Sequence, residues 1–186
     1  MSNKMPAISD VQRRIANTSI GASTLRGQMP GSVQIARQYL RTLDLRELGN
    51  LNESEFAHWL EDRTHELKEK LPEPSWGVAR KAINIFLENA FYDKFLSGQY
   101  KLDALEAALE IPLDSNVANG LSRDLEANGI RFPLPKWDRI KTLSPQVSRK
   151  FQDCAQAIAH LKQTSRIYLD LEYWRGGKEI GSPGIQ

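Results

Sequence analysis

Two charged residues stand in sequence settings that suit chemistry, and the first is a lysine within a largely apolar helical segment. After Trp76 and Gly77, apolar side chains cover most of the expected helix, and Lys81, Asn84 and Glu88 form its narrow polar strip. Such a helix is expected at the centre of the fold, where Lys81 is partly enclosed. Burial favours the neutral form of an amine, which is the nucleophilic form. The competing interpretation is a surface lysine whose stem covers apolar area.

Asp114 is the second candidate, at the point where an apolar segment gives way to a helix. Ile111-Pro112-Leu113 leads to Asp114 in an extended form, and a helical pattern continues from Val117. A carboxylate in this place can cap the helix by accepting hydrogen bonds from backbone amides. It can also stand at the lip of a cleft. The two interpretations are compatible, because a capping carboxylate still has one oxygen free for a substrate.

The spacing of apolar residues predicts the helices that position these two side chains. Apolar residues recur at helical intervals, and the alternation typical of strands is almost absent. Asn52 or Ser54 is expected to begin the second helix, and Asn128-Gly129 to end the helix after Asp114. Helices are predicted over residues 33–43, 56–71, 78–96, 102–109, 117–125 and 147–161. The prediction is an all-α fold, a single compact multi-helix domain over residues 1–175 with a flexible Gly-rich tail at 176–186.

Length and composition exclude several classes of site. The 186 residues contain one cysteine, which excludes an internal disulfide, a cysteine-based zinc site and a four-cysteine iron–sulfur cluster. The three histidines form no metal motif, so neither a metal nor another cofactor is expected. No stretch approaches the roughly 20 apolar residues of a membrane span, and the segment from Met1 to Pro30 lacks the apolar core of a signal peptide. A monomeric, cytoplasmic protein with no membrane partner is expected.

Charge is distributed unevenly along the chain. Residues 1–50 carry a net charge of +4, residues 51–110 of −5 and residues 111–186 of +3, within a total of +2. If the two basic ends converge on one face, that face suits a polyanion such as DNA. A mixed, solvated surface fits the same counts. Arg26, in a polar loop that contains a glycine, is a candidate phosphate contact, and a simple turn between helices is the alternative.

Two motifs support a more specific interpretation, WGVARKAIN at residues 76–84 and IPLDSNV at residues 111–117. Together they resemble the helix-hairpin-helix DNA glycosylases of the endonuclease III superfamily, in which a hairpin LPGVGRKTAN is followed by a VDTHV or LDGNV segment. The likeness spans residues 75–121, about a quarter of the chain. Ala79 stands where the family has its second hairpin glycine, and Ser75-Trp76 replaces Leu-Pro.

That resemblance implies a fold, an activity and a catalytic pair. The fold is helix-hairpin-helix glycosylase-like, and the enzyme flips a damaged or modified base out of duplex DNA and excises it. Lys81 is the implied nucleophile, which can form a Schiff base and cleave the strand as a lyase. Asp114 is the implied catalytic aspartate, which stabilises positive charge on the sugar. If Lys81 is displaced, water attacks and the enzyme is monofunctional.

The resemblance also implies contacts with DNA. The backbone amides expected to hold a phosphate are those of Gly77, Val78, Ala79 and Arg80. On the helix wheel the Arg80 side chain falls away from the Val78 stripe, so it is expected to reach outward. The candidates for the base pocket are Trp76, Asn116, Asp170 and Trp174. Asp170 is otherwise a cap, or the partner of an arginine such as Arg175.

Two other classes of function remain open. A non-catalytic DNA-binding module on the same scaffold fits the partial hairpin motif, because phosphate binding needs no catalytic pair. An α-helical protein–protein interaction or regulatory subunit fits the acidic stretch 51–110, which would repel DNA phosphates. A single cleft that contains both Lys81 and Asp114 within a basic rim would favour the enzyme.

Overall fold

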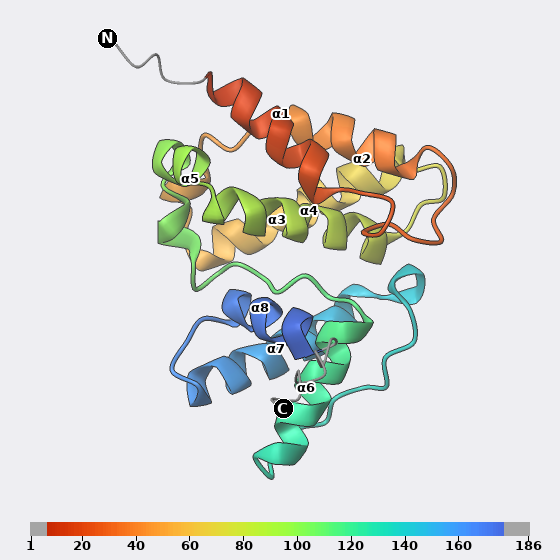
Figure 1. Ribbon diagram of the computed structural model, residues 1–186, viewed down its shortest axis with the longest axis vertical. Coiled ribbons are helices and arrows are strands. Elements are labelled where there is room, and N and C mark those ends of the chain that lie inside the picture. Colours follow the sequence, from red (N-terminus) through yellow and green to blue (C-terminus); the bar gives the residue numbers. More distant parts are fainter. Residues whose placement is uncertain (1–6, 177–186) are drawn as a thin grey trace, which may run out of the picture.

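The computed structural model describes residues 7–176, and the regular secondary structure of this part of the chain is helical, with no strand (Figure 1). Its eight α-helices are α1 (Ile8–Ser19), α2 (Ser32–Arg41), α3 (Glu53–Lys70), α4 (Trp76–Tyr92), α5 (Lys94–Tyr100), α6 (Ser115–Ala127), α7 (Pro145–Leu161) and α8 (Leu169–Gly176). Four short 3-10 helices join them, η1 (Leu48–Asn50), η2 (Leu102–Leu105), η3 (Ile140–Thr142) and η4 (Arg166–Tyr168). The all-α prediction is confirmed. Residues 177–186 of the expected tail lie outside the described residues.

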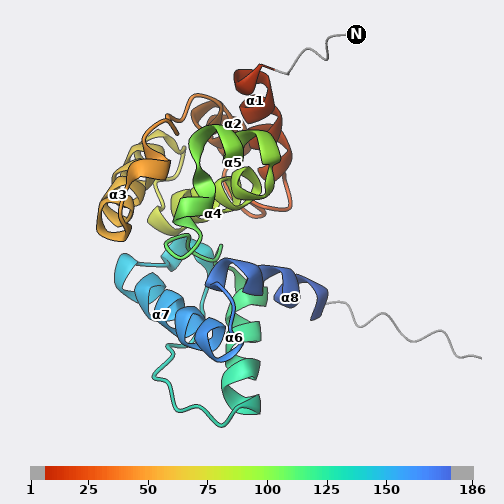
Figure 2. The same cartoon turned by 90° about the vertical axis from the view of Figure 1, so that its left-hand side faces the viewer.

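The helices gather in two lobes, which both ribbon views show one above the other (Figures 1 and 2). Helices α1 to α5 form the upper lobe, and α6 to α8 form the lower lobe. Each lobe has its own cluster of buried apolar side chains, with Phe56, Phe86 and Leu40 in the upper one and Phe151, Leu121 and Ile158 in the lower one. Helix α4 contacts η3 and α7, so it lies where the two lobes meet.

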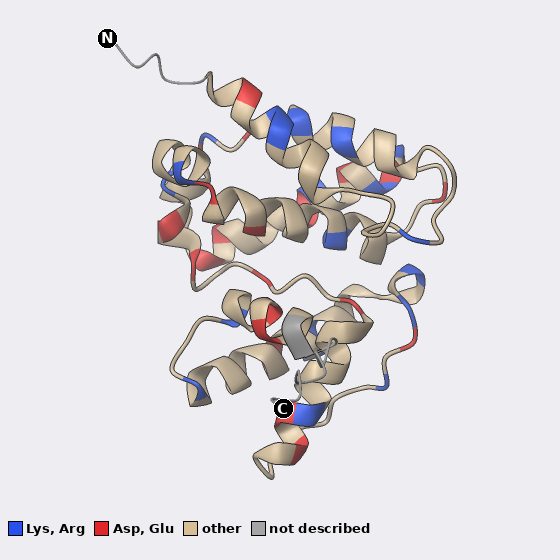
Figure 3. Ribbon diagram, viewed as in Figure 1, with Lys and Arg blue, Asp and Glu red and all other residues tan. Residues whose placement is uncertain are grey.

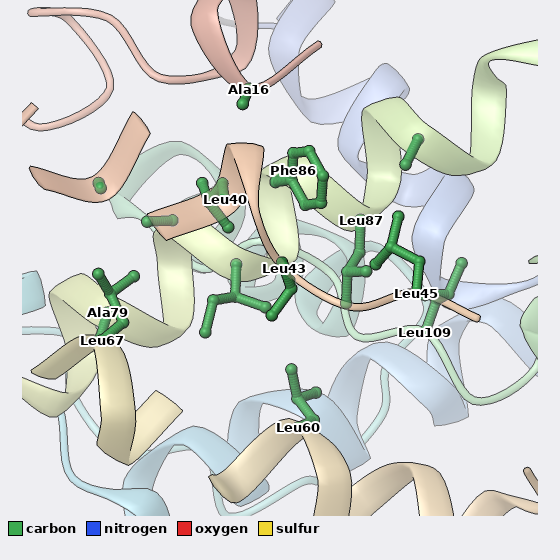
Figure 4. Packing of buried hydrophobic residues seen from close by; sticks show 14 of the residues in the cluster. Ala16, Leu40, Leu43, Leu45, Leu60, Leu67, Ala79, Phe86, Leu87 and Leu109 are labelled. Atoms are coloured by element: carbon green, nitrogen blue, oxygen red, sulfur yellow. The ribbon is translucent and has the colours of Figure 1, made fainter. Parts of the chain in front are cut away.

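Helix α4 is the central element of the upper lobe, as its apolar circumference predicts. Twelve of its 17 residues are buried. Figure 4 shows Ala79, Phe86 and Leu87 of α4 packed among side chains from neighbouring helices, including Ala16 of α1 and Leu60 of α3. A helix surrounded on nearly all sides needs an apolar surface on nearly all sides, which accounts for its composition.

Capping residues define where the helices begin and end. Asn52 begins α3 with a capping box completed by Glu55, and Ser144 caps α7 ahead of Pro145. Gly129, with a φ of +62°, follows the C-terminus of α6, as the Asn128-Gly129 pair predicts. The helix predicted over residues 78–96 is in fact two helices, because Asp93 ends α4 and caps α5 by accepting hydrogen bonds from the amides of Phe95 and Leu96.

Two helices have no counterpart among the predicted segments. Helix α1 buries Ala16 against the upper core, and α8 buries Leu169 and Tyr173 against the lower core. The sequence does carry a signal for α1, since Ile8, Val11 and Ile15 recur at helical spacing and pack against the upper core. Helix α8 has only eight residues, too few for a clear period. Among the helices described, none is long and apolar enough to cross a membrane.

Candidate active site

Lys81 and Asp114 meet at the junction of the two lobes. The Lys81 Nζ atom lies 3.3 Å from Asp114 Oδ2. The side chain of Lys81 is 12% exposed and that of Asp114 is 30% exposed, so the pair is largely enclosed but open on one side. The prediction that these two residues approach each other across the chain is confirmed.

The two carboxylate oxygen atoms of Asp114 have different partners, one in the helix cap and one in the candidate site. Oδ1 accepts hydrogen bonds from the backbone amides of Asn116 and Val117, at 2.9 and 3.1 Å, and so caps α6. Oδ2 faces Lys81. The cap therefore fixes the carboxylate in one orientation and leaves one oxygen for the ammonium group or a substrate.

Buried side chains hold the segment that carries Asp114 against α4. Arg80 Nε donates to Glu110 Oε2 at 2.9 Å, and Asn84 Nδ2 donates to the same oxygen at 2.9 Å. Gln152 of α7 exchanges two hydrogen bonds with the backbone of Ile111, at 2.8 and 3.1 Å. Arg166 donates to two further carbonyl groups of this segment. Arg80 adjoins Lys81, and Glu110 stands four residues before Asp114, so this network aligns the reactive pair.

One side of the pair opens into a cleft of about 720 Å³, here called the arginine-lined cleft. Its lining includes Arg26, Lys81, Asp114, Asn116, Arg139 and Trp174. The only other charged residue in its lining is Asp138, which pairs with Arg139 at 3.4 Å. None of the twelve acidic residues between positions 51 and 110 lines it. Figure 3 shows basic positions on the loop between α1 and α2 and around η3, whereas acidic positions gather near α5.

A second hollow of about 420 Å³ adjoins the first and is here called the acidic pocket. Its lining includes Ser19, Lys81, Glu88, Tyr92, Asp170 and Trp174. Lys81, Asp114 and Trp174 belong to the lining of both hollows. The reactive pair therefore stands between a basic cleft and a pocket with two further carboxyl groups.

The two carboxyl groups of the acidic pocket titrate well above their usual range. Burial raises the pKa of Glu88 to about 8, and the nearby charge of Asp170 adds to the shift. Burial also raises the pKa of Asp170 to about 6, with a further increase from Asp114 and an opposing decrease from Lys81. At neutral pH Glu88 therefore keeps its proton while Asp170 is mostly ionised.

The expectation that Arg80 reaches outward to DNA is wrong. Its side chain is only 10% exposed and pairs with Glu110 at 2.9 Å and with Glu61 at 3.3 Å. Thr64 accepts a further hydrogen bond from Arg80 Nη1 at 2.9 Å. These partners come from α3 and from the segment before α6, and helix-wheel geometry on α4 alone cannot reveal them.

The expected phosphate grip by the amides of residues 77–80 is also contradicted, because all four residues are buried. The amide of Val78 donates to Ser75 Oγ, and that of Ala79 donates to the Ser75 carbonyl group. Gly77 packs directly against η3, since a Cβ atom there would lie 2.7 Å from Leu143 Cβ and closer still to the Ile140 carbonyl oxygen. The segment is a packing surface between the lobes rather than an open hairpin.

Three of the four candidates for the base pocket line one or both hollows, and the fourth lines neither. Asn116 lines the arginine-lined cleft, Asp170 lines the acidic pocket, and Trp174 lines both and is 69% exposed. Trp76 does not belong with them. It is buried, donates from Nε1 to Glu61 at 2.8 Å and lies under the Arg80 guanidinium group. The side chain of Arg175, proposed as a partner of Asp170, lies outside the described residues.

Arg26 lines the arginine-lined cleft and is exposed, as a phosphate contact requires. Ser19, Glu88 and Arg139 are among the lining residues of the two hollows that had not been proposed for the site from sequence. Glu88 had a usable signal, because it stands seven residues after Lys81, two helical turns along the same face of α4. Ser19 and Arg139 come from distant segments, and no signal in the sequence pointed to them.

Within the described residues, no three His, Cys, Asp or Glu side chains are grouped closely enough to hold a metal ion.

Comparison of this chain with protein-family models, with curated proteins and with solved structures gives no match.

Proposed function

We propose that this protein is a DNA glycosylase-like enzyme that flips a damaged or modified base out of duplex DNA and excises it, with Lys81 and Asp114 as its catalytic pair. The observation that carries the proposal is the 3.3 Å approach of Lys81 Nζ to Asp114 Oδ2 at the edge of a cleft between two helical lobes. A catalytic pair must share access to one reacting atom, and the two side chains face a common hollow.

The chemistry assigns a different role to each residue. As the bond between C1′ and the base breaks, positive charge develops on the sugar, and the Asp114 carboxylate stabilises it. Asp114 Oδ2 also lies close enough to accept a proton from the Lys81 ammonium group. The base leaves with the electron pair of its bond to C1′, and the neutral amine forms a bond to C1′. The C1′–O4′ bond then opens, a proton passes from the nitrogen to O4′, and the resulting Schiff base permits strand cleavage. If water attacks instead, the same site releases the base without a covalent intermediate.

DNA phosphates are held in this proposal by the arginine-lined cleft rather than by the segment at residues 77–80. Arg26 and Arg139 are exposed and lie on loops of the upper and the lower lobe. Two basic side chains on opposite lobes can each contact one backbone phosphate and position the duplex over the reactive pair. The helix-hairpin-helix glycosylase-like fold forms part of the proposal, supported by the two lobes that flank the pair.

The alternative of a protein–protein or regulatory subunit drew its support from the acidic stretch 51–110. Of its twelve carboxylates, none lines the arginine-lined cleft and only Glu88 lines the acidic pocket. The negative charge of this stretch therefore does not oppose DNA at the cleft, and the enzyme is the better-supported function.

Borohydride trapping on a panel of duplexes, each with one modified base, tests the proposal. Reduction of a Schiff base links protein to DNA covalently, and the crosslink should map to Lys81. Lys81→Gln should abolish the crosslink, whereas Lys94→Gln, a substitution outside both hollows, should not. Base release without a crosslink would assign the attack to water. DNA binding without base release from any duplex would leave a non-catalytic DNA-binding module and overturn the enzyme.

A further inference from the structure

The acidic pocket holds buried polar atoms that nothing in the described protein satisfies. Glu88 is 6% exposed, and its Oε1 atom has no hydrogen-bond partner among the described residues. Ser19 is 7% exposed, and its Oγ atom likewise has no hydrogen-bond partner among the described residues. Both residues line the acidic pocket. In residues 7–176 one other buried side-chain atom, Arg63 Nε, has no hydrogen-bond partner. Buried polar groups normally have partners, so this pair points to a ligand that supplies them.

The charges around Glu88 determine which hydrogen bonds the pocket offers. Helix α4 contributes Lys81 and Tyr92, and α8 contributes Asp170. Asp114 faces the pocket from the start of α6, and α1 presents only the neutral Thr18 and Ser19. At neutral pH Glu88 is a carboxylic acid and Asp170 is mostly a carboxylate, from the pKa values of about 8 and 6. The pocket therefore combines one acidic O–H donor with several strong acceptors.

We propose that the acidic pocket receives the flipped base and selects one with a ring nitrogen acceptor beside an exocyclic amino group, as in adenine- or cytosine-type bases. This inference rests on the proposed glycosylase function. The Glu88 O–H group donates to the ring nitrogen, while its carbonyl oxygen accepts from the amino group. Ser19 and Asp170 are acceptors for the remaining amino hydrogen.

The position and size of the pocket fit this role. Glu88 stands seven residues after Lys81 on α4, so the two lie about 10 Å apart along the helix axis. A base whose C1′ atom faces Lys81 can extend in this direction toward Glu88. A hollow of about 420 Å³ lies within the range of small-ligand pockets. Tyr92 and Trp174 supply aromatic surface for the face of the base.

Bases of the uracil or thymine type are the disfavoured ligands. A carboxylic acid alone can pair with the N–H and C=O edge of such a base, so Glu88 does not discriminate by itself. Asp170 supplies the discrimination, because a base carbonyl oxygen directed at an ionised carboxylate finds no donor there. A buried acceptor left without a donor loses the free energy of a hydrogen bond, which lowers affinity.

Equilibrium binding to four duplexes tests the inference. Each duplex carries adenine, cytosine, uracil or thymine on a 2′-fluorinated sugar, which resists cleavage, opposite an abasic site that makes all four equally free to flip. At about pH 7 the wild type should bind the two amino-bearing duplexes about tenfold more tightly, the ratio that one good hydrogen bond supplies. Asp170→Asn should remove this preference, because an amide group can donate to a base carbonyl oxygen as well as accept from an amino group. Glu88→Leu should weaken the binding of all four duplexes, because the base then loses its hydrogen bonds with the carboxyl group.

Glu88→Gln is the matched control, because its amide group also offers one donor and one acceptor in a similar arrangement. It should keep the preference at about pH 7. At about pH 9 the wild type should bind the amino-bearing duplexes more weakly than at pH 7, since ionised Glu88 no longer donates to the ring nitrogen, whereas Glu88→Gln should keep its affinity.

Equal affinity for all four duplexes, a preference for uracil or thymine, or a preference that survives Asp170→Asn would overturn the inference and leave the proposed function standing. Failure to bind any duplex, in the wild type and in all the variants, would overturn the proposed function itself. Circular dichroism spectra of the wild type and the variants establish that the variants are folded.

Discussion

Arg80 carries its charge inside the protein, and the surrounding groups explain how that charge is tolerated. Glu110 and Glu61 neutralise it, and Thr64 satisfies a further N–H group. Breaking a buried pair by removing one partner leaves an uncompensated charge. Sequence could not reveal this arrangement, because Glu110 is 30 residues away and helix-wheel geometry shows only where Arg80 points on its own helix.

Arg80→Ala should destabilise the protein by about 3 kcal/mol, the usual cost of breaking a buried ion pair. The Glu110 carboxylate, which also accepts a hydrogen bond from Asn84, would then lose the cation that pairs with it. Urea denaturation measures the free energy of unfolding. Arg26→Ala, at an exposed position of the cleft, is the control and should change it by less than about 0.5 kcal/mol. A similarly small effect for Arg80→Ala would contradict the structural role.

The raised pKa of Glu88 makes the stability of the protein depend on pH. Its pKa is about 8 in the folded protein and near the ordinary value of 4.5 in the unfolded chain, so the folded state holds the proton more tightly. The stabilisation from this residue is fully present below pH 4.5 and is lost as the pH rises toward 8. Between about pH 5 and pH 7 the loss amounts to roughly 2–3 kcal/mol.

Glu88→Gln should remove this contribution, because glutamine does not titrate. Thermal unfolding at a series of pH values should therefore show a smaller fall in stability for the variant than for the wild type over this interval. Parallel curves for the two proteins would mean that Glu88 is ionised in the folded state.

At the scale of the helices, local signals predicted most elements but not every helix or every helix boundary. Asn52, Asp114 and Ser144 are caps whose residue type and position suffice to begin a helix. The break at Asp93 was missed because apolar spacing continues across it into α5. Helix α1 was missed although Ile8, Val11 and Ile15 recur at helical spacing, and α8 was missed because its eight residues span only about two turns.

A substitution at Gly77 tests how closely α4 and η3 must pack. Gly77→Ala places a Cβ atom against the Ile140 carbonyl group and Leu143, so it should destabilise the protein by about 1–3 kcal/mol. Because η3 and Arg139 form a wall of the arginine-lined cleft, the variant should also weaken DNA binding. Gly98→Ala, in α5, is the matched control, since a Cβ atom there meets nothing within 4 Å.

Gly98→Ala should be neutral or stabilising by up to about 1 kcal/mol, the difference in helix propensity between the two residues. Urea denaturation compares the two variants. Equal stability of Gly77→Ala and the wild type would show that η3 can move away from α4 at little cost.

At the scale of the whole molecule, the two lobes form the site together. Lys81 and Arg26 come from the upper lobe, whereas Asp114, Arg139 and Trp174 come from segments that pack in or beside the lower one. The approach of Lys81 to Asp114 was predictable from the resemblance of residues 75–121 to a family pattern. The contributions of Ser19 and Arg139 were not, because they arise only when segments remote in the sequence pack together.

If DNA occupies the arginine-lined cleft, its affinity should fall steeply with salt, with a slope in log K of about −0.9 for each phosphate neutralised. Arg26→Ala and Arg139→Ala should each reduce the steepness by about one such unit without changing the preferred base. Arg46→Ala is the control, because Arg46 is exposed, pairs with Asp44 and lies outside both hollows. Fluorescence titration at several salt concentrations measures the slopes. An equal reduction in all three variants would place the DNA elsewhere.

The most direct test of the central claim is the rate of base release by Asp114→Asn, measured on the modified duplex that the wild type processes fastest. Asparagine can still cap α6 at little cost, so folding and DNA affinity should stay close to those of the wild type. It cannot stabilise a developing cation with a negative charge or accept a proton from Lys81, so base release should fall by at least about 100-fold. Unchanged turnover in a folded, DNA-binding Asp114→Asn variant would show that Asp114 is only a helix cap and would contradict the proposed active site.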